Sequence, residues 1–162
     1  MTCITTSNIH PQATLDKNME NNPFLKNFKG SFNNMLRWPQ LDSLWATLRL
    51  QENARWYVYA IGETPPDNPM TAEELDSFIN EINTLLRKEH KEDYCGIVYA
   101  DNPASPRMIK IYDPDNLGVV CGFSEAPPLP GWVLSLEPPC DLPAAIPPPA
   151  NRRRWWQRLC KK

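Results

Sequence analysis

The apolar positions between Thr71 and His90 repeat with the period of an α-helix. Thr71 is followed three residues later by Glu74, which is the pattern of a capping box at a helix start. Arg87 and Lys88 lie where the helix dipole favours cations. These features predict an amphipathic helix over residues 71–90 whose buried stripe comprises Leu75, Phe78, Ile79, Ile82, Leu85 and Leu86.

Two shorter helices are predicted nearer the N-terminus. Asn22 followed by Pro23 is typical of a helix start, because asparagine caps the free amides and proline fits the first turn. We expect this helix to run through Gly30, which weakens a helix without forbidding it. Its apolar face would hold Phe24, Leu25, Phe28, Phe32, Met35 and Leu36. A second helix is predicted from Pro39, with Leu41, Leu44, Trp45 and Leu48 on one side.

Aromatic and β-branched runs predict four or five strands. The runs cover residues 54–61, 94–100, 107–112 and 117–123, and residues 132–136 would add an edge strand. The Asp113–Asn116 turn predicts a hairpin between 107–112 and 117–123. Ile109 and Ile111 should face the helix at 71–90, with Met108, Lys110 and Tyr112 on the opposite face. This order of elements predicts an α+β domain with a mainly antiparallel sheet covered on one face.

Proline content divides the chain. Nine of the 18 prolines fall between Pro127 and Pro149, where neither a helix interior nor a central strand tolerates them. We therefore expect a flexible N-terminal segment (1–21), one folded domain (22–136), a proline-rich spacer (137–150) and a tail (151–162). The spacer would be extended and stiff, in the polyproline conformation.

Charge separates the tail from the remainder of the chain. The tail holds six basic residues and no acid, so residues 1–150 retain 11 of the 17 basic residues and all 19 acidic ones. An acidic body thus carries a basic, tryptophan-containing tail. As a helix, the tail would place Trp155, Trp156, Leu159 and Cys160 on one side. The eleven residues 152–162 form only a marginal helix in water, so this helix would form on contact with a partner.

The tail is the predicted partner-binding site. Its predicted contact residues are Arg153, Arg154, Trp155, Trp156, Arg158, Leu159 and Lys161. Tryptophan and arginine dominate binding hot spots, which favours a protein partner with an acidic or apolar groove. An anionic membrane surface is a second possible partner. Nucleic acid fits poorly, because the acidic body repels phosphate. A further alternative is that the tail folds back on the acidic body and buries both indoles.

No set of residues predicts a metal, a cofactor or a reaction. The five cysteines are scattered, and neither His10 nor His90 has metal-ligand spacing. Residues 113–118 resemble the start of a calcium loop, but Leu117 stands where a ligand is required. Glycine-rich phosphate loops are absent. His90 with Glu92, Asp93 and Cys95 is the one cluster with catalytic ingredients, and polar residues in a surface connection are the simpler interpretation.

The sequence predicts a non-enzymatic accessory protein, an adaptor or assembly factor that binds protein partners through its folded body and tail. A cytoplasmic location is expected, because no secretory signal or membrane-spanning apolar run is present and the cysteines suit free thiols. The first alternative is a peripheral membrane protein anchored by the tail. The second is a small enzyme that uses the region of His90.

Overall fold

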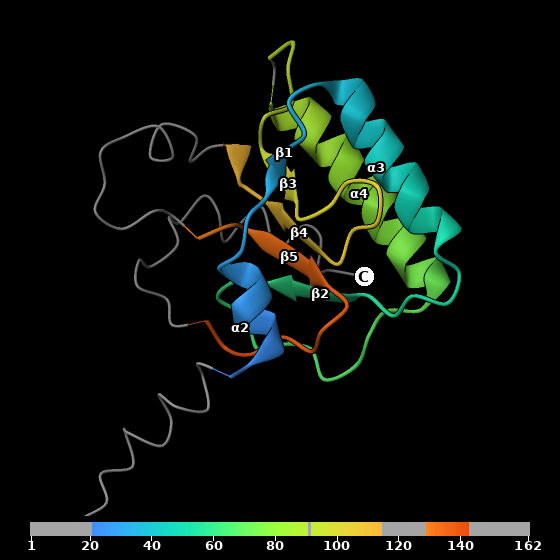
Figure 1. Cartoon of the computed structure of the whole chain (residues 1–162). Coiled ribbons are helices and arrows are strands. Elements are labelled where there is room, and N and C mark those ends of the chain that lie inside the picture. The colour runs from blue at the N-terminus through green and yellow to red at the C-terminus, as the bar shows by residue number, and fades with distance from the viewer. Residues whose placement is uncertain (1–20, 91, 115–128, 143–162) are drawn as a thin grey trace, which may run out of the picture.

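A five-stranded antiparallel sheet carries helices on both of its faces in the computed structural model, which describes residues 21–90, 92–114 and 129–142 (Figure 1). The strand order is β1 (Asn33–Asn34), β3 (Val98–Ala100), β4 (Met108–Ile111), β5 (Trp132–Ser135) and β2 (Tyr57–Ala60). Every pairing of neighbouring strands is antiparallel. The predicted α+β class is therefore confirmed.

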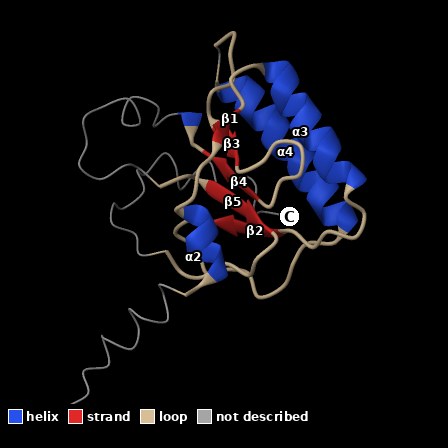
Figure 2. Cartoon of the chain, viewed as in Figure 1, coloured by secondary structure: helices blue, strands red, loops and turns tan. Residues whose placement is uncertain are grey.

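Two helices, α3 (Trp38–Leu50) and α4 (Ala72–Glu89), lie side by side over one face of the sheet (Figure 2). The predicted capping box starts α4, with Thr71 Oγ1 accepting from Glu74 N at 3.2 Å and Glu74 Oε2 accepting from Thr71 N at 2.9 Å. The predicted stripe is buried except for Leu85, which is half-buried. All four apolar positions predicted for α3 are also buried. Together these residues form the main core against Ile109, Ile111 and Leu134.

The strand predicted at the sheet edge is in the interior. β5 lies between β4 and β2, and each of its four residues is buried. Trp132 and Leu134 join the core beneath α3 and α4, while Val133 joins a second core on the opposite face. Both edges of β4 are occupied by β3 and β5, so the predicted hairpin between 107–112 and 117–123 is wrong. Residues 117–123 lie outside the described residues.

The first predicted helix is shorter than expected. α2 spans only Pro23–Phe28, with Asn22 capping it as predicted through Oδ1 contacts of 2.9 and 3.3 Å to the next free amides. The chain then turns at Gly30 and enters β1, which pairs with Tyr99 and Ala100. The low helix propensity of glycine and the cross-strand bonds available to the asparagines explain why the helix stops.

The sheet is covered on two faces, not one as predicted. α2 lies on the face opposite α3 and α4, as Figure 1 shows. Phe24 and Leu25 of this helix pack in the second core with Tyr59, Met108, Val133, Ile61 and Leu142. The amide of Leu142 donates to Tyr59 Oη at 3.3 Å, so the start of the predicted spacer packs on the domain. The N-terminal segment 1–20 and the remaining spacer lie outside the described residues.

Candidate binding groove between α3 and α4

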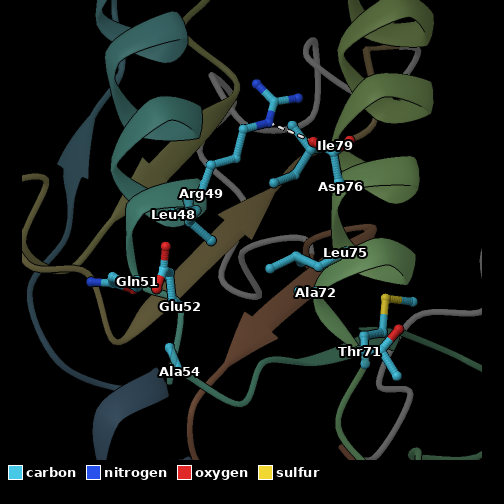
Figure 3. Close-up of a pocket in the computed structure, with 11 residues that line it drawn as sticks. Leu48, Arg49, Gln51, Glu52, Ala54, Thr71, Ala72, Leu75, Asp76 and Ile79 are labelled. Carbon is cyan, nitrogen blue, oxygen red and sulfur yellow. Dashed lines mark hydrogen bonds and ion pairs between the residues drawn. The ribbon is translucent and has the colours of Figure 1, made fainter.

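A groove opens between the C-terminal end of α3 and the N-terminal end of α4. Its volume is about 520 Å³. Both helices, the segment after α3 and the residues just before α4 supply its walls (Figure 3). The lining residues are Leu48, Arg49, Gln51, Glu52, Ala54, Met70, Thr71, Ala72, Leu75, Asp76 and Ile79.

The floor of the groove is apolar. Leu48 of α3 and Leu75 and Ile79 of α4 point towards one another across the gap between the helices (Figure 3). These three side chains belong to the main core and are at most 8% exposed. Ala54 and Met70 add further apolar lining. A ligand that enters the groove therefore meets an aliphatic surface that is continuous with the core of the domain.

An ion pair crosses the groove at one end. Arg49 Nε lies 2.7 Å from Asp76 Oδ1, and a second guanidinium nitrogen donates to Asn80 Oδ1 at 2.7 Å. The bond joins α3 to α4, as the dashed line in Figure 3 shows. Both partners are about half exposed, so the pair contributes at most about 1 kcal/mol to stability. Its main effect here is to neutralise the single cation that lines the groove.

Gln51 lines the groove just after α3 ends. It is the C-cap residue of α3, and its ψ of 67° takes the backbone out of the helix. Its side-chain Oε1 is buried and has no hydrogen-bond partner among the described residues. A buried acceptor without a donor costs about 1–3 kcal/mol, so the end of α3 carries a local cost in stability.

The end of α3 carries exposed side chains. Leu50, the last residue of α3, is 81% exposed, the highest value among the large apolar side chains that the structure describes. Glu52, two residues later, is also exposed. Exposed single apolar residues are common on protein surfaces. Of these two residues, Glu52 lines the groove, so the exposed part of the groove wall at this end is acidic.

The ends of the two helices create this opening. The capping box fixes the start of α4 at Thr71, and a bond from Met70 N to Trp56 O at 2.8 Å ties the preceding residue to the start of β2. α3 leaves the helical conformation at Gln51. Between Gln51 and Met70 the chain forms β2 at the edge of the sheet, so only the residues close to the two helix ends line the groove.

The groove has the size of a ligand-binding pocket. Its volume falls in the range of pockets that enclose drug-sized ligands, roughly 300–1,000 Å³. Its lining contains no histidine, cysteine or lysine. The Thr71 hydroxyl is already used to cap α4. In the described parts of the chain, no group of three or more His, Cys, Asp or Glu side chains is placed to hold a metal ion.

His90 lies at the opposite end of α4. Its ring is buried, and Nε2 lies 3.0 Å from the carbonyl oxygen of Tyr94. The rings of Trp38 and Tyr94 flank it with centroids 6.0 and 5.9 Å away. A small hollow of about 260 Å³ is lined by Trp38, Arg87, His90 and Glu92. His90 is thus the C-cap residue of α4, and its imidazole packs against the two aromatic rings.

Two neighbours of His90 are held by packing or by an ion pair. Arg87 lies 4.7 Å above the Trp38 ring and forms a 2.6 Å ion pair with Asp42 of α3. Cys95 is buried, and this burial raises the pKa of its thiol. A raised pKa disfavours the thiolate that nucleophilic chemistry needs. Cys95 therefore behaves as the small buried apolar residue that its position in a strand-like run predicts.

The predicted contact residues of the tail, from Arg153 to Lys161, lie outside the described residues. The groove itself was not predicted. Its apolar lining residues carry the same helical periodicity as the core, so only the three-dimensional arrangement shows which of them face an opening. The exposed Leu50 and the interruption of periodicity after it were the available signals.

Comparisons with known proteins give no functional assignment: no protein-family model, no curated protein and no solved structure matches this chain. Over the residues that the structure describes, none of the helices combines the length and the apolar character that a membrane crossing requires.

Proposed function

We propose that this protein is a non-enzymatic accessory protein, an adaptor or assembly factor, that holds a protein partner through its folded body and its basic tail. The groove between α3 and α4 is the observation that supports this proposal most strongly. It joins an apolar floor to a polar rim, which is the composition of surfaces that receive a segment of another protein.

The groove would supply the apolar anchor site of this contact. Leu48, Leu75 and Ile79 form a preorganised surface, because the core holds them in place whether or not a partner is bound. Preorganised surfaces lose little conformational entropy on binding. Glu52 and Asp76 add polar contacts from the same lining.

The tail would supply charge and a second anchor. Its six basic residues increase the rate of encounter with an acidic partner, and Trp155 and Trp156 can act as anchors once contact is made. A cytoplasmic location accords with this role. The tail also suits an anionic membrane surface, so membrane association is the alternative that the experiment must separate.

Affinity capture with matched groove variants tests the proposal. Ala72→Trp places an indole at the exposed first residue of α4, where it occupies the groove, and Ala46→Trp makes the same change at an exposed position of α3 outside it. Quantitative mass spectrometry should show partners that the wild type and Ala46→Trp retain. Ala72→Trp should retain them about tenfold less, as expected for loss of a hot-spot contact.

The same material separates protein binding from membrane binding. Pelleting with anionic vesicles should leave the protein in the supernatant if the tail serves a protein partner. The proposed function would be refuted if Ala72→Trp and a Trp155→Ala/Trp156→Ala variant each retained as much partner as the wild type. Efficient pelleting that depends on Trp155 and Trp156 would support the membrane alternative instead.

A further inference from the structure

We infer that the groove between α3 and α4 is a docking site for residues 151–162 of the same chain when no partner is bound. The inference rests on the proposed function, because it concerns the regulation of the same groove. In this arrangement the tail and a protein partner compete for the groove. A partner that uses the groove must displace the tail, and it thereby frees the tail for a second contact.

Charge complementarity is the first support. The groove lining carries one cation, Arg49, and two anions, Glu52 and Asp76. The first turn of α4 adds Glu73 and Glu74, which brings the local net charge to −3. Arg49 is committed to its bond with Asp76, and no ion pair with a described residue engages Glu52, Glu73 or Glu74. The tail carries six positive charges and no negative one.

The chemistry of the floor is the second support. The indoles of Trp155 and Trp156 need an apolar surface together with an acceptor for each N–H group, since a buried indole N–H usually finds a partner. The groove provides the aliphatic surface of Leu48 and Leu75. Glu52 and Asp76 also line it, and their carboxylates can accept from an indole N–H group.

The segment between Leu142 and Trp155, the tether, is long enough for this contact within one molecule. The described chain ends at Leu142, which is anchored on the domain, and 12 residues separate it from Trp155. Four prolines fall in that interval. In an extended polyproline conformation the 12 residues would span about 37 Å. A domain of this size has a radius of gyration of about 13 Å, so the tether can reach around it.

The tether also makes weak binding sufficient. A short linker gives an effective concentration on the order of 1 mM. A tail that binds with a Kd of about 0.1 mM as a separate peptide would then occupy the groove in roughly nine of ten molecules. An incoming partner would see its apparent affinity reduced about tenfold by this competition. The tail would therefore set a threshold for partner binding without preventing it.

Methyl and amide NMR of the full-length protein tests the inference. Wild type should be compared with Trp155→Ala/Trp156→Ala. We expect shift differences at the methyl groups of Leu48, Ala72 and Leu75 and at the side-chain amide of Gln51, with resonances near His90 unchanged. The differences should persist on dilution, because the contact is intramolecular. Differences that vanish on dilution would overturn the inference in favour of docking between two copies.

A matched charge pair gives the control. Glu52→Lys changes the charge beside the groove, and Asp93→Lys makes the same change at an exposed position near the opposite end of α4. Glu52→Lys should raise the undocked fraction about fivefold, as reported by the Trp155 and Trp156 indole resonances, whereas Asp93→Lys should leave it unchanged. Groove resonances that are insensitive to the tail changes would refute the inference. Groove-dependent partner capture would then still support the proposed function, so the two failures are distinguishable.

Discussion

Lys110 allows a prediction with a definite sign. It lies in β4 on the face that α2 covers, and its Nζ donates to the carbonyl oxygen of Phe28 at 2.7 Å. The rings of Phe28 and Phe32 lie 4.0 and 3.9 Å from the same nitrogen. Burial lowers the pKa of this amine from 10.5 to about 8. The folded protein therefore releases this proton more readily than the unfolded chain does.

The sign of the pH dependence follows from this difference. Between about pH 8 and pH 10.5 the unfolded chain binds more protons at Lys110 than the folded protein, so the free energy of unfolding contributed by Lys110 rises with pH. Below about pH 8 both states bind the proton, so the contribution of Lys110 no longer changes with pH. At full burial the shift would correspond to about 3 kcal/mol. The side chain is partly exposed, and screening by solvent reduces the expected effect to about 1–2 kcal/mol.

Urea unfolding of wild type and Lys110→Met measures this effect. Methionine keeps the packing against Phe28 and Phe32 without the charge. The difference in unfolding free energy between the two proteins should change by about 1 kcal/mol in favour of wild type from about pH 7 to about pH 9.5. The comparison of wild type with Lys110→Met is needed because other groups also make stability depend on pH. Burial raises the pKa values of Tyr59, Tyr112 and Cys95.

The contribution of these three groups to stability changes with pH in the opposite direction to that of Lys110. A folded acid with a raised pKa keeps its proton longer than the unfolded chain, so its contribution to stability is lost as the pH rises. The contribution is the same in both proteins and cancels in the difference. A difference that stays constant over this pH range, or that moves against wild type, would show that the attraction of the two rings for the ammonium outweighs its desolvation.

Two further predictions concern the packing on the two faces of the sheet. Ile82→Ala removes a fully buried side chain from the main core and should lower the unfolding free energy by about 2–5 kcal/mol, whereas Ser77→Ala on the exposed side of α4 should change it by less than about 0.5 kcal/mol; equal effects in urea unfolding would contradict the described core. Tyr59→Phe removes the hydroxyl that accepts from Leu142 N and should cost about 1 kcal/mol. It should also speed limited proteolysis near Leu142, and an unchanged cleavage rate would show that this bond does not hold the segment.

Local signals account for the elements that were predicted well. The helix at α4 combines a capping box, a periodic apolar stripe and cations in its last turn, and all three act within one element. Asn22 and Pro23 likewise act on the first turn of α2. Such features depend on residues three or four positions apart, so the sequence alone shows them.

The errors came from interactions between distant parts of the chain. Asn33 and Asn34 leave the helical pattern because Tyr99 and Ala100 offer them a strand to pair with. The sequence predicts an edge strand at residues 132–136, whereas β5 lies inside the sheet and all four of its residues are buried. The position of a strand within a sheet depends on partners that no local pattern specifies.

The groove shows why a binding surface is harder to predict than a core. Leu75 and Ile82 belong to the same apolar stripe of α4 and have the same helical spacing. Both side chains are buried in the main core, but only Leu75 also lines the groove. Leu75 lies in the first turn of α4, across from the residues that end α3, whereas Ile82 lies two turns further along the helix. The apolar stripe therefore continues from the core into the groove, and its periodicity does not show where the core stops and a surface begins.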